Sequence, residues 1–317
     1  MTTTITLDDI RAAAVRISRI AHRTPVMISK TFNAATGVEV HFKCENFQRG
    51  GAFKIRGASN FIFSLTPEQL RAGVVAVSSG NHAQAVAIAA REVGASATLV
   101  MPTDAPKTKI EATRGYGADI VLFDRMRERR DDVVARVAGE RGGVVVPPFD
   151  HPWIAAGQGT AAIELLEEVP DLDALIAPVG GGGLISGCAT AAKALRPGIH
   201  VYGVEPELAS DTWQSLRQGE RIEIPPPETI ADGLRTTRPG EVTFPIIQRL
   251  VDDIVLVSEQ EIKDAVKFLL TRLKILVEPS GAVGAAALLT GKLPRTVRRA
   301  GVILSGGNVD YDQLAAM

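Results

Sequence analysis

Short apolar runs alternate with longer helical patterns over most of this sequence, and this alternation limits its fold more than any other feature. Apolar runs at residues 74–77, 97–101 and 120–123 are each followed by a segment in which apolar residues have helical spacing. A second series begins after Pro152 and contains an apolar run at residues 174–179. Because parallel strands are joined through crossover helices, the alternation predicts an α/β protein whose sheets carry helices on both faces.

The two series predict two domains, each built on an open twisted sheet. We expect a large domain at residues 1–64 and 148–317 and a small mobile domain at residues 65–147. Pro147-Pro148 and the proline-rich segment 221–228 are typical of connections. Helices are expected at residues 82–93, 107–114, 131–140, 161–168, 184–195 and 259–276, and further strands at residues 144–146, 200–204, 254–257 and 301–305.

Composition limits the partners and the location of the protein. The 317 residues carry a formal net charge of −1 and only 5% aromatic residues, which argues against nucleic acid or an anionic membrane as a partner. Cys44 and Cys188 are far apart and form no Cys-x-x-Cys pair, which fits a reducing cytosol. The N-terminus has no apolar signal core, so we expect a cytoplasmic protein.

Lys54 is an unusual lysine because it stands between Phe53 and Ile55 in a glycine-rich segment. Partial desolvation lowers the pKa of an amine, and a neutral amine forms an imine with a carbonyl cofactor. Taken alone, a lysine between two apolar residues is more often a strand lysine with its head in water. The chemical interpretation of Lys54 therefore depends on the rest of the chain.

Four consecutive glycines follow the apolar run at residues 174–179 and precede a predicted helix: Gly180, Gly181, Gly182 and Gly183. Such a turn lets backbone N–H groups converge at a helix start, where the helix dipole favours an anion such as phosphate. Glycines also cluster at helix starts for packing alone. The Walker pattern is absent and the glycine spacing differs from the dinucleotide-binding pattern, although Glu205 after the next strand could imitate its ribose-binding acid.

Two further turns also follow predicted strands. Ser78-Ser79-Gly80-Asn81-His82 offers hydroxyl, amide and helix-start N–H groups, which suit a carboxylate. Its simpler interpretation is a helix with Ser79 as N-cap and His82 in the first turn. Ser305-Gly306-Gly307-Asn308 follows the last predicted strand and is, by itself, a common strand exit.

In this order, the Lys54 segment and the three turns resemble the second structural class, fold type II, of the pyridoxal-phosphate enzymes. This is the family of tryptophan synthase β, cysteine synthase and the serine/threonine dehydratases, and the resemblance extends from about Thr24 to Asp310. It implies a fold like that of tryptophan synthase β and pyridoxal 5'-phosphate as cofactor. Three segments are similar to the serine/threonine dehydratase (ammonia-lyase) and serine racemase branch in particular: Lys43-Cys44-Glu45-Asn46-Phe47-Gln48, Ala156-Gly157-Gln158-Gly159-Thr160 and Ala231-Asp232-Gly233.

The resemblance also implies roles for single residues. Lys54 would carry the cofactor as a Schiff base, with Phe53 beside the ring, Asn81 against the 3-hydroxyl and Ser305 at the pyridine nitrogen. The phosphate would be bound by the backbone of Gly180, Gly181, Gly182, Gly183 and Leu184. The substrate carboxylate would be bound by Ser78, Ser79, Asn81 and His82.

The implied reaction is dehydration of a small hydroxy amino acid, L-threonine or L-serine. The substrate amine displaces Lys54, whose freed amine removes the Cα proton before the β-hydroxyl leaves, and a 2-oxo acid and ammonia are released. A serine at the ring nitrogen, unlike a carboxylate, does not stabilise a protonated ring. The ring is then a weaker electron sink, which favours prompt elimination.

Ser79 keeps a second reaction open. Serine racemases of this branch carry a serine here that faces the ring from the side opposite the lysine, whereas many simple threonine dehydratases carry alanine. Serine racemase and 3-hydroxyaspartate dehydratase are therefore alternatives, the latter because Arg130 aligns with an active-site arginine that would hold a second carboxylate. A different class of alternative is a non-catalytic protein that binds a phosphate ligand in the same cradle.

Glu205, Ala209 and Asp211 resemble the divalent-cation site of the same branch. Two carboxylates, one carbonyl and water suit Mg²⁺, Ca²⁺ or Mn²⁺, although acids on a strand-to-helix loop are usually only solvated. The family habit further implies a homodimer.

Overall fold

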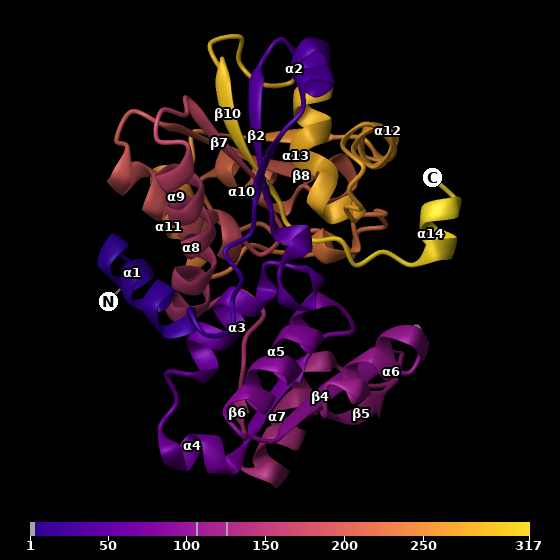
Figure 1. Ribbon diagram of the computed structural model, residues 1–317. Helices are drawn as coiled ribbons and strands as arrows, with labels where there is room; N and C mark the ends of the chain where they lie inside the picture. Colours follow the sequence, from indigo (N-terminus) through magenta and orange to yellow (C-terminus); the bar gives the residue numbers. More distant parts are fainter. Residues whose placement is uncertain (1–3, 106, 125) are drawn as a thin grey trace.

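The computed structural model describes residues 4–105, 107–124 and 126–317. In these residues the chain forms two sheets, one of six strands and one of four, with helices around both (Figure 1). In spatial order, the larger sheet contains β1 (Val26–Ile28), β2 (Glu39–Cys44), β10 (Arg299–Leu304), β7 (Ala174–Pro178), β8 (His200–Pro206) and β9 (Asp253–Val257). Its neighbouring strands are parallel except for the antiparallel pair β1 and β2.

The smaller sheet is parallel throughout. In spatial order it contains β5 (Asp119–Phe123), β4 (Ala97–Pro102), β3 (Val74–Val77) and β6 (Val144–Val145). All of these strands lie within residues 65–147, the range expected for the small domain. The domain boundaries and the mobility of this part stay predictions.

Helices cover both faces of the larger sheet because successive side chains of its buried strands point to opposite faces. In β7, Ala174 and Ile176 belong to one apolar cluster, whereas Leu175 and Ala177 belong to another. The first cluster is completed by α2 (Lys30–Thr36), α12 (Glu259–Phe268) and α13 (Pro279–Leu289). The second is completed by α1 (Leu7–Ile17), α8 (Pro152–Glu168), α9 (Gly183–Leu195) and α11 (Thr243–Leu250).

The smaller sheet follows the same rule. Val74 and Ala76 face the apolar side of α5 (Asn81–Glu92), whereas Val75 packs with residues of α7 (Arg130–Arg141) on the other face. The expected α/β class, with two open sheets and helices on both faces of each, is confirmed. The remaining helices are α4 (Pro67–Ala72), α6 (Lys107–Gly115), α10 (Asp211–Gln218) and α14 (Tyr311–Ala315).

Helix α3 (Lys54–Ile62) lies between the two sheets (Figure 1). It packs against α8 of the larger part and α5 of the smaller part. Its Ile55 and Phe61 share an apolar cluster with Val74 and Ala76 of the smaller sheet. The lysine singled out by sequence is the first residue of this helix.

Several elements differ from the expectations. Strands β1 and β2 were not predicted, because β2 carries Glu39, His41 and Lys43 and does not resemble a buried strand. Helix α8 begins at Pro152, well before the expected residue 161, because its glycines allow close helix packing that a propensity pattern does not reveal.

The helix expected at residues 259–276 ends earlier. Helix α12 stops at Phe268, a π-helical turn covers Leu269–Leu273, and Lys274 adopts a positive φ of 63°. Apolar residues continue at helical spacing through this segment without a glycine or proline, so the sequence gives no sign of the turn. The turn brings the chain back to begin α13.

No helix in the described part of the chain is long and apolar enough to cross a membrane.

Candidate active site

Lys54 is held where the larger sheet meets α3. The Phe53 backbone N–H donates to the Ser305 carbonyl at 3.0 Å, which ties the start of α3 to the end of β10. The Lys54 Nζ donates to the Pro148 carbonyl at 2.8 Å and lies 5.2 Å from the centre of the Phe53 ring. The backbone of Ser305 therefore contacts the residue that precedes Lys54, and the roles of Phe53 and Ser305 at the cofactor stay predictions.

Burial lowers the pKa of the Lys54 amine from 10.5 to about 8, against an opposing effect of the Glu278 carboxylate. About one amine in ten is then neutral at pH 7, compared with fewer than about one in a thousand for an ordinary lysine. Only the neutral amine is a nucleophile or a base. The environment of Lys54 thus supplies the reactivity expected from its apolar neighbours.

The four-glycine turn follows β7 and leads into α9, as predicted. Gly182 has a positive φ of 90°, and a Cβ there would lie 2.7 Å from the Ile247 side chain. A Cβ on Gly181 would overlap the ring of Phe149, and one on Gly183 would lie 3.1 Å from the Phe149 Cβ. Phe149 directly follows Pro148, so this turn and the Lys54 amine contact adjacent residues of one segment.

The turn from Ser78 to His82 follows β3, and α5 begins at Asn81. The Ser78 Oγ accepts the Gly80 N–H at 3.1 Å, and Ser79 is half-buried. The Asn81 amide donates to the Glu278 Oε1 at 2.8 Å. This bond joins the smaller part of the molecule to the larger part beside Lys54.

His82 is buried, and its Nε2 lies 3.1 Å from the Val146 carbonyl, which requires that the ring donates this hydrogen bond. Burial and the nearby Lys54 amine lower the pKa of His82 to about 3. The imidazole is therefore neutral at physiological pH. It offers a substrate carboxylate no positive charge.

Sequence reasoning missed Glu278 and gave no role to Asn308, the last residue of the third turn. Glu278 is only 4% exposed, and its N–H donates to the Gly306 carbonyl at 3.0 Å. The Asn308 amide donates to the Asn81 Oδ1 at 2.9 Å and to the Gly50 carbonyl at 2.7 Å. An acid at the end of the apolar run Ile275-Leu276-Val277, just before Pro279, was the available signal for Glu278.

Arg130 is the first residue of α7 and is exposed. Helix α7 packs through Val133, Val134 and Val137 on the face of the smaller sheet opposite α5. In the described residues, α7 thus lies on the other face of the smaller sheet from α5, which carries Asn81. A role for Arg130 in substrate binding stays a prediction.

Glu205 and Asp211 are both fully buried and close enough for their charges to interact. The Glu205 carboxylate accepts the Thr212 N–H at 3.1 Å and the Trp213 N–H at 2.8 Å, and Thr236 donates to Asp211 at 3.2 Å. Burial, followed by the charge of Asp211, raises the pKa of Glu205 well above its usual value, and burial raises that of Asp211 to about 7. These carboxylates are poorly compensated by the groups around them.

Ala209, the third predicted ligand, ends a 3-10 helix at Glu207–Ala209 between these two acids. The described residues contain no cluster of three or more His, Cys, Asp or Glu side chains that could hold a metal, and the predicted set has only two carboxylates. The Thr212 hydroxyl is buried without a hydrogen-bond partner in the described structure. This orphaned oxygen and the carboxylate pair fit a hard cation.

Comparison with known proteins agrees with the site. The family profile described as pyridoxal-phosphate dependent enzyme matches residues 17–306. The chain is 48% identical over 310 residues to a serine racemase of Schizosaccharomyces pombe, covering 98% of this chain and 96% of that protein. It is 48% identical over 312 residues to an L-threo-3-hydroxyaspartate ammonia-lyase of Saccharomyces cerevisiae, with the same 98% and 96% coverage.

The chain belongs to the pyridoxal-phosphate-dependent enzymes. Its fold is that of fold type II, since the structure of maize serine racemase matches it with a TM-score of 0.95 and 46% identity. That match covers 99% of this chain and 97% of the maize chain. The cofactor expected from the motifs, pyridoxal phosphate, is supported by the family.

The lowered pKa of Lys54 predicts how this enzyme, stripped of cofactor, reacts with pyridoxal phosphate. The rate of covalent attachment should rise with pH and reach half of its plateau near pH 8, because the amine becomes neutral above its pKa. Stopped-flow absorbance over a pH series measures this midpoint.

Glu278→Gln is the matched variant for this measurement. It keeps a hydrogen-bond acceptor for Asn81 but removes the charge that raises the Lys54 pKa, so the midpoint should move to lower pH. A wild-type midpoint close to 10.5, the usual pKa of a lysine, would contradict the assigned environment.

Proposed function

We propose that this enzyme is an ammonia-lyase that removes water from a small L-3-hydroxy amino acid and releases a 2-oxo acid and ammonia. The observation that carries the proposal is the Lys54 amine, hydrogen-bonded to Pro148 and with its pKa lowered to about 8. An amine with this pKa is both a nucleophile for a carbonyl cofactor and a base for a Cα proton near neutral pH.

The residues present fit pyridoxal phosphate. The turn Gly180, Gly181, Gly182 and Gly183, continued by Leu184, would hold the phosphate through backbone N–H groups. Side chains at Gly181 and Gly183 would crowd Phe149, and one at Gly182 would collide with Ile247. Asn81 would lie at the 3-hydroxyl, Ser305 at the ring nitrogen and Phe53 beside the ring. Once bound, the cofactor withdraws electrons from the Cα of the attached amino acid.

The protein side of the reaction is carried by two elements. The turn before α5 would bind the substrate carboxylate through the hydroxyls of Ser78 and Ser79, the amide of Asn81 and helix-start N–H groups. Because His82 is neutral, it would help to hold this turn by its bond to Val146 rather than pair with the carboxylate. Lys54 would take the Cα proton, and the β-hydroxyl would leave as water after gaining a proton from an acid of the site, such as the phosphate of the bound cofactor.

Racemisation of serine is the second candidate activity, and Ser79 is the observation that favours it. A hydroxyl on the side of Cα opposite Lys54 would return the proton there and invert the configuration. The similarity to serine racemases supports this reading, and the similarity to a hydroxyaspartate ammonia-lyase supports dehydration. For 3-hydroxyaspartate, Arg130 would supply the cation for the second carboxylate.

A divalent cation at Glu205, Ala209 and Asp211 is part of the proposal. Mg²⁺, Ca²⁺ or Mn²⁺ would compensate the two buried carboxylates whose pKa values are raised. Glu205 lies one residue before the end of β8 and Asp211 begins α10, so the ion would tie the sheet to this helix. Its role would be structural, since these residues are not among those assembled around Lys54.

We also propose a homodimer in a reducing compartment such as the cytoplasm. The two cysteines, Cys44 and Cys188, lie in the described residues and are free and buried, which supports the compartment. The dimer rests on the habit of the family.

A substrate panel tests the main proposal. L-serine, L-threonine or one diastereomer of 3-hydroxyaspartate should yield a 2-oxo acid, whereas D-serine should yield little, because Lys54 removes the proton from one face only. Product assays for 2-oxo acid and for inverted amino acid separate dehydration from racemisation. Lys54→Ala should lose both activities and the visible band of the cofactor, which would also exclude a merely ligand-binding protein.

Ser79→Ala tests the second candidate. Loss of the hydroxyl should lower racemisation by about a hundredfold or more and elimination from the L-isomer by only about threefold, because general acid catalysis acts only on the opposite face and one carboxylate contact is lost in both reactions. Ser78→Ala is the neighbouring control and should lower both activities together by disturbing the turn. An equal loss of both activities in Ser79→Ala would contradict the assignment of Ser79.

Thermal unfolding tests the cation site. At about 100 times its Kd, Mg²⁺ should stabilise the protein by about 2.7 kcal/mol, or roughly 5 °C in Tm for a chain of this size. Asp211→Asn should raise the Tm of the metal-free protein, because the raised pKa shows that folding disfavours this charge, and should abolish the response to Mg²⁺. A full Mg²⁺ response in Asp211→Asn would mean that the ion binds elsewhere.

A further inference from the structure

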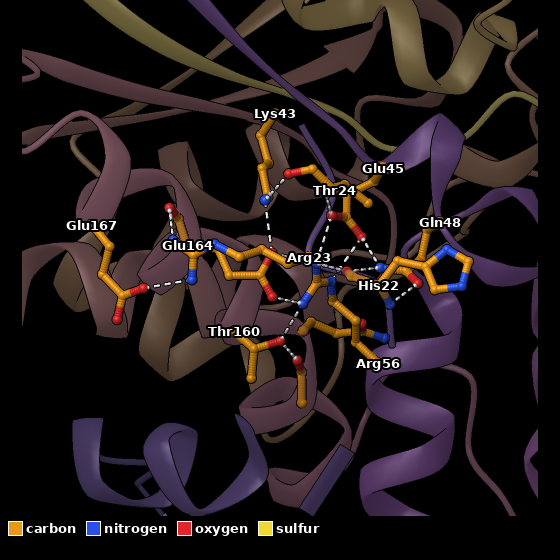
Figure 2. A network of polar contacts seen from close by, with 12 residues as sticks. His22, Arg23, Thr24, Lys43, Glu45, Gln48, Arg56, Thr160, Glu164 and Glu167 are labelled. Atoms are coloured by element: carbon orange, nitrogen blue, oxygen red, sulfur yellow. Dashed lines mark hydrogen bonds and ion pairs between the residues drawn. The ribbon is translucent and has the colours of Figure 1, made fainter. Parts of the chain in front are cut away.

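Two sequence segments that mark the enzyme's branch have no place in the reaction described so far: residues 43–48 and 156–160. The structure brings both of them to one side chain, that of Arg56 (Figure 2). Arg56 lies two residues after Lys54 in α3 and is fully buried.

The Arg56 guanidinium is hydrogen-bonded to two carboxylates. Its Nε and Nη2 donate to the Glu45 carboxylate, each at 2.8 Å. Its Nη1 and Nη2 donate to the Glu164 carboxylate at 2.7 and 2.8 Å. The Thr160 hydroxyl accepts the second N–H of Nη1 at 3.0 Å, and the His22 carbonyl shares an N–H of Nη2 at 3.1 Å, so every donor nitrogen of the planar group is used.

The charges in this cluster balance. Lys43, which is also fully buried, pairs with Glu164 at 2.7 Å and donates to the Thr24 carbonyl at 2.6 Å. Two cations, Lys43 and Arg56, therefore face two anions, Glu45 and Glu164. Although burial opposes it, the guanidinium of Arg56 holds the pKa of Glu45 below its usual value, so Glu45 is ionised.

A balanced cluster exerts little net field on Lys54. The pKa of the Lys54 amine is instead governed by burial and by Glu278. Arg56 can therefore influence Lys54 through the position of the α3 backbone rather than through its charge. Residues two apart in a helix project about 200° apart, so Arg56 anchors the side of α3 opposite the lysine.

The backbone of the same turn is clamped as well. A Cβ on Gly157 of α8 would lie 2.6 Å from the Arg56 carbonyl and 2.7 Å from the Gly57 Cα, so the two helices touch through their main chains. The Gly57 N–H donates to the Gln158 Oε1 at 3.2 Å. On the side opposite Lys54, the first turn of α3 is thus fixed by the Arg56 side chain and by the backbone contact with Gly157.

Stability alone does not account for such a cluster. Buried ion pairs are often no more stabilising than apolar residues of the same volume, because desolvation offsets their attraction. The planar guanidinium adds directional contacts, because its N–H groups donate to carboxylates in a fixed, planar geometry. An aliphatic core would let α3 slide or rotate by small amounts.

We propose that Arg56 is a positioning residue for Lys54: clamped by Glu45 and Glu164, it sets the first turn of α3 so that the amine faces the cofactor. This rests on the proposed role of Lys54 as the residue that binds the cofactor. The proposal also gives the two branch segments a function. Residues 43–48 supply Lys43 and Glu45 on one side of Arg56. Residues 156–160 supply Gly157 and Thr160 on the other side.

Arg56→Lys tests the proposal, because it keeps the charge and loses the fork. In the cofactor-free enzyme, the amine of Lys54 adds to the aldehyde of pyridoxal phosphate and water leaves, giving an imine that borohydride reduces to a stable amine. The plateau rate of attachment should fall at least tenfold in Arg56→Lys, while its pH midpoint stays within half a unit of wild type. Stopped-flow absorbance gives the rate, and mass spectrometry of the reduced protein identifies the labelled lysine.

Arg23→Lys is the matched control. Arg23 belongs to the same region, but it pairs with Glu167 at the surface with about half of its side chain exposed. The same substitution there should change the attachment rate by less than twofold. Circular dichroism and thermal unfolding report whether each variant is folded.

Three results would overturn the proposal. The first is a folded Arg56→Lys whose attachment rate lies within twofold of wild type, and the second is a loss of thermal stability without any change in that rate. The third is a shifted pH midpoint, which would mean that the cluster acts through its charge. If Arg56→Lys does not fold, Glu164→Asp decides, because Glu164 is 16% exposed and a shorter acid only loosens the clamp. It should lower the attachment rate about threefold, and an unchanged rate would overturn the proposal.

The attachment assay uses no amino-acid substrate, so it separates this proposal from the proposed function. An enzyme that attaches the cofactor at Lys54 but acts on none of the hydroxy amino acids refutes the function and leaves the role of Arg56 to be decided by the variants. Labelling of a lysine other than Lys54 refutes the assignment of Lys54, on which both rest.

Discussion

The close contact of α3 with α8 is the constraint on which the rest of the site depends. Helix α3 begins at Lys54, immediately after the backbone bond from Phe53 to Ser305 at the end of β10. From there it packs on α8 through glycine and carries apolar residues into the core of the smaller sheet. A helix placed in this way holds one amine at the junction of two sheets, where turns from both can reach it.

Burial affects the protonation of charged groups in three different ways in this molecule. The Lys54 amine is desolvated with Glu278 nearby and becomes partly neutral, which makes it reactive. Around Arg56, opposite charges meet, and the Glu45 carboxylate and the Arg56 guanidinium remain ionised. At Glu205 and Asp211 two like charges are buried together, which leaves room for a cation. Burial is common to all three, and the number and sign of the neighbours decide the outcome.

The sequence predicted the fold class and most elements of the two sheets, because apolar periodicity reports which faces are buried. It failed where polar residues lie in buried strands, as Lys43 does in β2, since the partners that allow such burial are distant in sequence. It also failed at the end of α12, where the chain turns without glycine or proline. The helix expected from residue 161 in fact begins at Pro152, and the glycines in its first half serve close packing.

By itself, the sequence determined the family, the cofactor class and the turns that surround Lys54, because these depend on local strings of glycine, serine and asparagine. Only the tertiary structure decided the state of the charged groups. The pKa of Lys54, the neutral form of His82 and the part played by Glu278 all depend on burial and on neighbours that are far away in the chain. Periodicity and motifs carry no record of such distances, so these properties become visible only when the chain is folded.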